Sequence, residues 1–162
     1  MKDRLSLRFA KHTLLLVAIF YLSTGCKEQN LKNLPLGMFD SGTGGLTVLE
    51  QFLAMDSFNN ETGEERPDGK ADFSGEDFIY LADQANMPYG VYSSRNKTDF
   101  LKELIVKDAQ FLTSGKNSSK IVVIACNTAT AYGLEDVEDL FEKSDNGVKV
   151  VGVIDEIGRA HV

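Results

Sequence analysis

Apolar residues gather in four short runs along the chain, at 36–39, 78–82, 121–125 and 148–154, and each run is followed by polar or glycine-rich residues. The run at 121–125 reads Ile-Val-Val-Ile-Ala. Such a continuous apolar run is typical of a strand that is covered on both faces of a parallel sheet. The four runs therefore predict four strands.

The segments between these runs carry apolar residues at helical spacing and predict helices over 46–55, 97–113 and 127–143. Gly115 is expected to end the second helix. Repeated alternation of strand and helix predicts an α/β fold, a parallel sheet with flanking helices and right-handed crossovers. In the second helix we expect one apolar stripe, made of Phe100, Leu101, Leu104, Ile105, Phe111 and Leu112.

Residues 57–77 interrupt this alternation. They are rich in Asn, Gly, Glu and Asp and contain almost no apolar side chains. Such a composition cannot bury enough apolar surface to pack as a core element. The segment is predicted to be an exposed insertion or a mobile loop, without recognisable chemistry.

The first 25 residues have a different character. Basic residues precede an apolar run at 14–22. This run is about nine residues long, whereas a membrane-spanning helix needs roughly 20. Residues 1–25 are therefore predicted to be an export signal, with a buried or membrane helix as the alternative.

The signal ends in Ser23-Thr24-Gly25-Cys26, which resembles the lipobox of bacterial lipoproteins, where the cysteine is lipidated and becomes the mature N-terminus. Ser23 departs from the usual aliphatic residue, so ordinary signal-peptide cleavage or a bare N-terminal anchor stays open. A lipid on Cys26 would hold the protein at a membrane surface without spanning the bilayer. The predicted location is the bacterial cell envelope, either lipid-anchored or periplasmic.

The last residues, 156–162, resemble the translation of a widely used sequencing adapter. We interpret them as an artefact outside the fold, with a genuine short C-terminus as the alternative. Under this interpretation the native reading frame breaks off near Asp155 and the chain is a fragment. His161 is then no candidate for a catalytic histidine.

Composition narrows the function classes. The 162 residues carry a net charge of −7, so no basic field is available for phosphates and nucleic acid is not an expected partner. Two cysteines cannot form a disulfide framework, and no Cys/His spacing resembles a zinc site. No metal site is predicted.

Polar residues stand at the ends of three predicted strands, at 40–41, 83–90 and 126–128. Ligands of parallel α/β sheets bind beyond the carboxyl ends of the strands. Cys126 follows a strand and precedes a helix, where nearby backbone N–H groups and the helix dipole favour a thiolate. The alternative is a small buried core residue.

The residues beside this cysteine allow two interpretations. Asn127 and Thr128 could bind a substrate carboxylate or cap the helix. The glycine-rich stretch at 40–45 could cradle a phosphate or form only a tight turn, and no Walker-type loop is present. Asp40 could receive a proton, orient a thiol or bind a substrate ammonium group.

Three stretches, FDSGTGGLTVLE, IYLADQANMPYG and IVVIACNTATA, resemble in this order the N-terminal motifs of the glutamate racemases, within the aspartate/glutamate racemase superfamily. VKVVGVID resembles the strand that follows them, with Asp155 where the family usually has proline. The resemblance implies that residues 34–155 form part of the first domain of a two-domain fold, interrupted by the insertion at 57–77.

The resemblance also implies cofactor-independent racemisation of an amino acid, most simply L-glutamate to D-glutamate for peptidoglycan and the cell wall. Inverting the α-carbon without a cofactor needs a base on one face and an acid on the other. In this family both groups are cysteines. A homodimer is one assembly that the resemblance allows, and a membrane contact is expected only through the signal or lipid anchor. The implied catalytic residues are Cys126 and Asp40, and the implied substrate-binding residues are Ser41, Tyr89, Gly90, Asn127 and Thr128.

The chain departs from the family in one respect. The second cysteine of the family lies in a Gly-Cys-Thr-His motif that has no counterpart here, and Cys26 precedes the first strand. We therefore expect the chain by itself to be inactive in the interconversion of L- and D-glutamate. Two alternatives remain, since glutamate racemases normally act inside the cell. One is an exported amino-acid-binding lipoprotein with a degenerate racemase pocket, and the other is an aspartate racemase relative.

Overall fold

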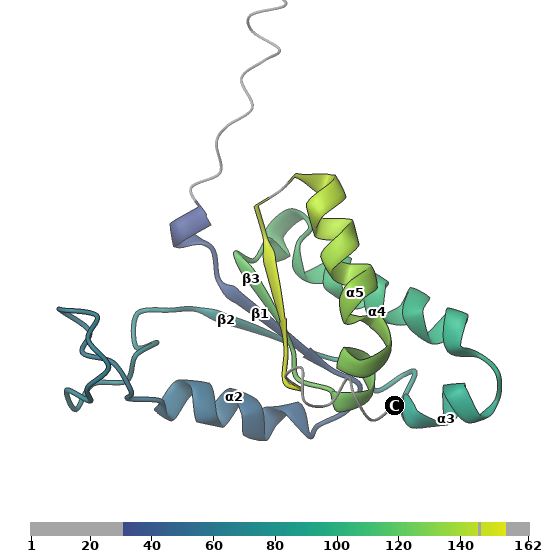
Figure 1. Ribbon diagram of the computed structural model, residues 1–162, viewed down its shortest axis with the longest axis horizontal. Helices are drawn as coiled ribbons and strands as arrows, with labels where there is room; N and C mark the ends of the chain where they lie inside the picture. The colour runs from purple at the N-terminus through teal and green to yellow at the C-terminus, as the bar shows by residue number, and fades with distance from the viewer. Residues whose placement is uncertain (1–30, 146, 155–162) are drawn as a thin grey trace, which may run out of the picture. The chain divides into compact units, whose positions relative to one another are not determined.

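Four parallel strands form one sheet, as the four apolar runs predicted (Figure 1). They are β1 (Leu36–Asp40), β2 (Phe78–Ala82), β3 (Ile121–Ile124) and β4 (Lys149–Gly152). Their order across the sheet is β2-β1-β3-β4, and every neighbouring pair is parallel. The α/β fold class predicted from the sequence is therefore confirmed.

The computed structural model describes residues 31–145 and 147–154. The predicted export signal at 1–25, Cys26 and the adapter-like ending at 156–162 lie outside these residues, and so does Asp155. Among the helices that the structure describes, none has the length and apolar character needed to cross a bilayer.

Three long helices connect the strands, close to the predicted ranges: α2 (Gly45–Ala54), α4 (Thr98–Leu112) and α5 (Asn127–Ser144). The short helices were not predicted, because three to five residues show no periodicity. Gly115 does not end α4 directly, since the helix is capped at Thr113 and Gly115 begins a separate turn at φ +58°. The short helices are η1 (Leu31–Asn33), α3 (Gly90–Ser94) and η2 (Gly115–Asn117).

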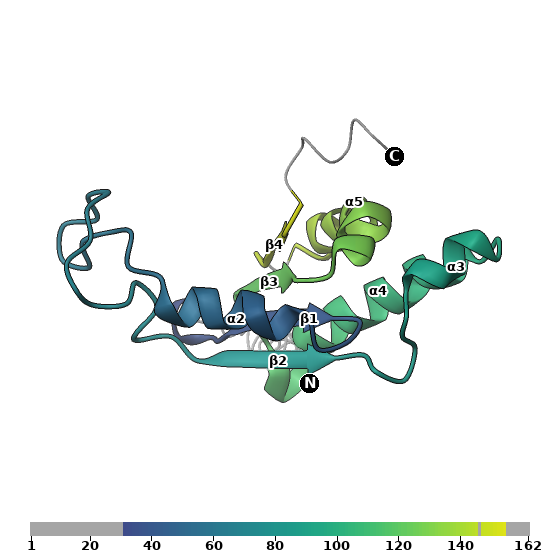
Figure 2. The same cartoon turned by 90° about the horizontal axis from the view of Figure 1, so that it is seen from below.

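Helices cover both faces of the sheet, as Figures 1 and 2 show. Phe39, Val122 and Ile124 belong to the larger core cluster, which they form with α4 and α5. Met38 and Val123 belong to a smaller cluster with α2 on the opposite face. Two covered faces explain why the strand sequences are continuously apolar instead of alternating.

The apolar stripe expected along α4 is narrower than predicted. Leu101, Ile105 and Leu112 are fully buried, whereas Phe100 is 44% exposed and Phe111 is 50% exposed. The two phenylalanines share one side of the helix, about 100° around from the buried stripe. Phe100 packs instead on the ring of Tyr92 in α3, with centroids 5.8 Å apart.

The polar segment at 57–77 is largely exposed and contains no helix or strand. Its backbone is held by aspartate side chains. The carboxylate of Asp72 accepts the N–H groups of Ser57 (2.9 Å) and Phe58 (3.1 Å). These bonds join the two ends of the segment and satisfy N–H groups that no helix or strand pairs.

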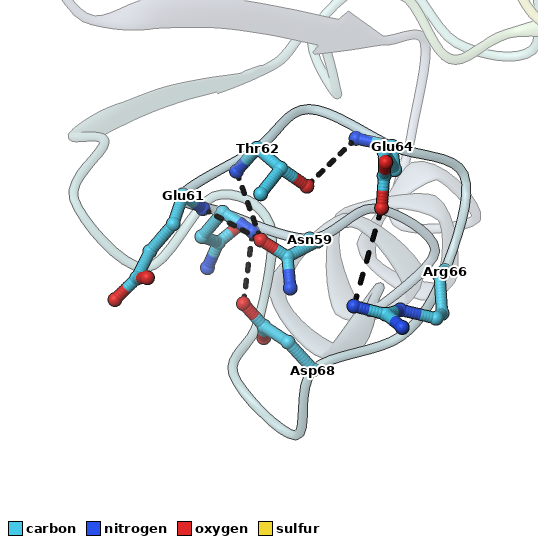
Figure 3. Close-up of polar contacts among 7 residues, drawn as sticks. Asn59, Glu61, Thr62, Glu64, Arg66 and Asp68 are labelled. Carbon is cyan, nitrogen blue, oxygen red and sulfur yellow. Dashed lines mark hydrogen bonds and ion pairs between the residues drawn. The ribbon is translucent and has the colours of Figure 1, made fainter.

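The tip of this segment is held by a local side-chain turn (Figure 3). The side-chain oxygen of Asn59 accepts the N–H groups of Glu61 (3.0 Å) and Thr62 (2.9 Å). At its base, the ring of Phe73 lies 5.3 Å from that of Phe52 in α2. The insertion is therefore tied to the domain by ring packing and to itself by local hydrogen bonds.

Candidate active site

The strand order creates a switch point between β1 and β3. The chain leaves β1 through α2 to reach β2 on one side, and then returns through α4 to place β3 on the other side. Phe39 is in register with Ile124, so the carboxyl ends of the two strands lie side by side. Doubly wound sheets bind their ligands at this place.

Cys126 lies at this switch point and caps α5. Its sulfur accepts the N–H of Ala129 at 3.4 Å, and the residue is 7% exposed. The sulfur therefore lies at the N-terminal end of the helix, where one reading of the sequence placed it. The residue also belongs to the larger core cluster, so the alternative, a small buried core residue, fits the structure as well. Because the sulfur is the cap, Asn127 and Thr128 do not fill this role; Asn127 is exposed and Thr128 half-buried in the first turn.

Ser41 brings the end of β1 to the same thiol. Its Oγ lies 3.3 Å from the Sγ of Cys126, and either group can be the donor. Ser41 is half-buried in the loop that leads to α2. The structure thus joins two of the residues that the sequence singled out separately.

Asp40 is the last residue of β1 and is 6% exposed. Its Oδ2 accepts the N–H of Gly45 at 2.8 Å, so the carboxylate stabilises the start of α2. A Cβ on Gly45 would lie 2.8 Å from the Cβ of Asp40 and 2.9 Å from that of Ala125. The glycine-rich stretch therefore acts as a tight strand-to-helix turn at Gly45, where no larger residue fits.

Tyr89 is buried and is held between two carboxylates. Its hydroxyl lies 2.7 Å from the Oδ2 of Asp83 and 2.8 Å from the Oδ2 of Asp108. Burial, followed by these two hydrogen bonds, raises the pKa of Tyr89 above its ordinary value. The hydroxyl is thus occupied, the carbonyl accepts the N–H of Tyr92 at 3.1 Å, and the whole residue is only 1% exposed, so the structure does not present Tyr89 to a ligand. The neighbouring Gly90 is exposed at the start of α3, with open space around it.

The sequence did not single out Asp108. Burial raises the pKa of this carboxyl to about 6. Tyr89 has one hydroxyl proton and can donate to one carboxylate at a time, so both short contacts are hydrogen bonds when Asp108 itself is protonated. A signal was available: Asp108 follows Leu101 and Ile105 at helical spacing, on the buried side of α4.

Tyr80 is a second residue that the sequence did not single out. Its hydroxyl is buried and has no hydrogen-bond partner among the described residues. Burial raises the pKa of Tyr80, and electrostatic interactions with Asp40 and Cys126 raise it further. The available signal was a tyrosine in the middle of an apolar strand that leads to the predicted site.

No group of three or more His, Cys, Asp or Glu residues within 31–145 and 147–154 is arranged to hold a metal ion. Two depressions of about 500 Å³ and 490 Å³ lie elsewhere. The first is lined by the end of α5 and the start of β4, and the second by η1 and the beginning of β3. Neither is lined by Asp40, Ser41 or Cys126.

The fold and the site define a doubly wound parallel α/β domain with a thiol at its switch point. No protein-family model matches the chain. The chain is 32% identical over 125 residues to the glutamate racemase of Clostridium novyi (strain NT). This alignment covers 77% of the chain and 38% of that relative. It is 34% identical over 128 residues to the glutamate racemase of Gloeothece citriformis, in an alignment that covers 79% of the chain and 36% of that relative.

A solved structure agrees with these relatives. The crystal structure of glutamate racemase from Thermus thermophilus in complex with beta-chloro-D-alanine aligns with a TM-score of 0.53 and 32% sequence identity, over 79% of this chain and 39% of that one. The chain thus spans well under half the length of the relatives it matches. Similarity to these glutamate racemases supports assignment of the chain to the amino-acid racemases, a family of isomerases.

Proposed function

We propose that this chain carries one thiol side of a cofactor-independent glutamate racemase site. The observation that carries the proposal is the contact between Ser41 and Cys126 at the switch point of the sheet. The proposal is supported by the meeting of a sulfur, a hydroxyl and the N-terminus of α5 at the edge where doubly wound sheets bind their ligands. Homology to glutamate racemases supports glutamate as the substrate.

In this proposal the thiolate of Cys126 accepts the α-proton of the substrate, which leaves a thiol and a carbanion. The thiol of Cys126, whose proton exchanges with solvent, then returns a proton to the carbanion on the same face and becomes a thiolate again, so charge and protons balance. Preorganised donors are needed to hold the charge that develops. Ser41, Gly90, Asn127 and Thr128 are proposed to bind the substrate, and Asp40 is proposed to assist the thiol.

Inversion needs a second acid or base on the opposite face of the α-carbon. Cys126 is the free cysteine within the described residues. We therefore propose that the chain alone exchanges the α-proton without completing the racemisation. Supply of D-glutamate for peptidoglycan is the role that a complete site would serve.

The test is exchange in heavy water. The full chain is incubated with L-glutamate in D2O, loss of the α-proton signal is followed by NMR, and the Cys126→Ser variant is the control. Exchange in the wild type that disappears in the variant is the expected result. Binding of glutamate without exchange would favour the amino-acid-binding lipoprotein, and absence of both would overturn the proposal. Exchange of aspartate in preference to glutamate would favour the aspartate racemase relative.

We also propose that residues 1–25 direct export and that Cys26 carries a lipid, which places the protein at the cell envelope. The proposal rests on the basic start, the short apolar run and the Gly25-Cys26 ending. Incorporation of labelled palmitate in a bacterial host, absent in the Cys26→Ala variant, is the expected result. Unmodified full-length protein in the cytoplasm would contradict it.

A further inference from the structure

Tyr89 joins two carboxylates that belong to different parts of the fold. Its hydroxyl lies 2.7 Å from the Oδ2 of Asp83, which follows β2, and 2.8 Å from the Oδ2 of Asp108 in α4. Tyr89 is 1% exposed, and both aspartates are half-buried. These three residues, the tyrosine trio, therefore tie the loop at 83–90 to α4.

The trio needs two protons for its two short contacts. A tyrosine hydroxyl carries one proton, and an ionised carboxylate can only accept. If both aspartates were ionised, one of the contacts would have no proton between its oxygens. Distances of 2.7 and 2.8 Å are those of O–H···O hydrogen bonds. The geometry therefore fits one ionised and one protonated carboxyl.

The neighbouring donors decide which carboxyl keeps the proton. The side-chain amide nitrogen of Asn86 lies 2.9 and 3.0 Å from the two oxygens of Asp83, and such donors favour the ionised form. Asp108 has the hydroxyl of Tyr89 as its hydrogen-bond partner within the described part of the chain. The proton therefore belongs on Asp108, which donates to Tyr89, while Tyr89 donates to Asp83.

The elements packed against α4 bring no positive charge to Asp108. The groups that act on this carboxyl are the other two members of the trio. On α5, the carboxylate of Asp136 lies 2.8 Å from the Nζ of Lys102. On α3, the hydroxyl of Tyr92 donates to a main-chain carbonyl of the loop at 3.0 Å. The two strands that pack against α4 contribute the apolar side chains Phe39, Ile79 and Leu81.

We propose that the tyrosine trio is a proton-dependent latch, which holds the loop at 83–90 on α4 while Asp108 is protonated and releases it when this proton passes to water. Loss of the proton leaves one hydroxyl between two like charges, which disfavour each other at this distance. Burial raises the pKa of Asp108 to about 6, so the latch is expected to be closed below this pH and open above it.

Release of the latch is expected to affect the end of the loop and not its start. The N–H of Asp83 donates to the carbonyl of Asp40 at 2.9 Å, which holds the start of the loop on the sheet. Gly90 directly follows Tyr89 at the other end. Opening would therefore move Gly90. The consequence for substrate binding rests on the proposed function, whereas the latch itself does not.

The experiment is hydrogen exchange on the full chain, measured by mass spectrometry of peptides that cover 83–92 and corrected for the intrinsic exchange rate at each pH. In the wild type, protection is expected to fall about tenfold between about pH 5 and about pH 7, because the closed form binds the extra proton. In Asp108→Asn the amide can donate to Tyr89 at every pH, so protection is expected to stay constant. The control, Asp99→Asn, is an exposed change at the start of α4 and should follow the wild type.

A second measurement needs no variant. In a chain with ¹³C-labelled aspartate, the carboxyl signals of Asp83 and Asp108 are expected to move through one common midpoint, because coupled carboxyls titrate as a pair. Separate midpoints would overturn the inference, and so would loop protection that has the same pH dependence in the wild type and in Asp108→Asn. Both measurements are made without an amino acid. A working latch in a chain that does not exchange the α-proton of glutamate would therefore count against the proposed function alone.

Discussion

The Oγ of Ser41 lies 3.3 Å from the Sγ of Cys126, although 85 positions separate the two residues. One follows β1 and the other follows β3, and the sheet makes these strands neighbours. The contact therefore depends on the strand order of the sheet. It also means that a change in either residue should be detected at the other.

Replacing Ser41 with alanine removes this contact. If the hydroxyl donates to the sulfur, its loss makes the thiolate less stable relative to the thiol. Alkylation of Cys126 at neutral pH is then expected to slow several-fold, about as for other lost hydrogen bonds to charged groups. The rate is measured by mass spectrometry of the Cys126 peptide.

The control for this change is Ser118→Ala. Ser118 donates to the carbonyl of Gly115 at 2.8 Å, in the turn before β3 and thus at the opposite end of the strand. Its replacement should leave alkylation unchanged. Faster alkylation in Ser41→Ala would show that the thiol, and not the serine, is the donor.

Replacing Gly45 with alanine should destabilise the domain. The added Cβ would meet Asp40, Ala125 and Tyr80 at 2.8–2.9 Å, which is closer than real Cβ contacts. We expect the free energy of unfolding to fall by about 1–3 kcal/mol, as for other overpacked sites. Urea denaturation measures the loss.

Gly75→Ala is the matched control, because nothing lies within 4 Å of a Cβ at that position and its φ is ordinary. Equal stability of the two alanine variants would contradict the close packing at Gly45. An intact fold in Gly75→Ala would show that the loss in Gly45→Ala is local in origin.

The Asp108 carboxyl should make stability depend on pH. Its pKa is raised from 3.8 to about 6 in the folded protein by burial. Between these values the folded state binds more protons than the unfolded state, so this contribution is fully present below the unfolded pKa and is lost as pH rises through about 6. Because the group is partly exposed, the loss is on the order of 1 kcal/mol.

The Asp108→Asn variant should lack this part of the pH dependence, as measured by urea denaturation across the acidic range. Glu103→Gln, an exposed change on the same helix, is the control and should follow the wild type. Identical curves for wild type and Asp108→Asn would show that the contact with Tyr89 does not require a protonated carboxyl.

The insertion should open locally when Asp72 is replaced. Alanine removes the acceptor for the N–H groups of Ser57 and Phe58, and the backbone around them loses its local constraint. Limited proteolysis within 57–70 is expected to accelerate several-fold, while the thermal midpoint of the domain changes little, as for other exposed loops. The control is Asp77→Ala, an exposed change at the end of the insertion, which should not alter the cleavage rate. An unchanged cleavage rate in Asp72→Ala would contradict the role of its carboxylate in holding the backbone.

Much of the fold was predictable from local patterns. The strands at 36–39, 78–82 and 121–125 and the three long helices appear within about two residues of their predicted ends. Periodicity carries this information because an apolar run or stripe must face a core wherever the segment lies. The position of Cys126 between a strand and a helix was predictable for the same reason, since β3 and α5 are consecutive in the chain.

Other features were decided only by the tertiary structure. No local pattern tells that Phe100 and Phe111 lie outside the buried stripe of α4, because the width of the stripe depends on how the neighbouring elements pack. Likewise, Tyr89 and Asp108 meet only because the loop after β2 lies against α4. These contacts join segments whose distance in space is independent of their own sequences.

The sequence alone therefore determined where the elements lie and which strand ends carry polar chemistry, because both follow from interactions between residues close in the chain. The order β2-β1-β3-β4 was decided by packing among distant segments. That order brings Ser41 to Cys126 and leaves the hydroxyl of Tyr80 buried beside Gly45. Proximity across a sheet arises from burial summed over the whole domain, and no single segment carries it.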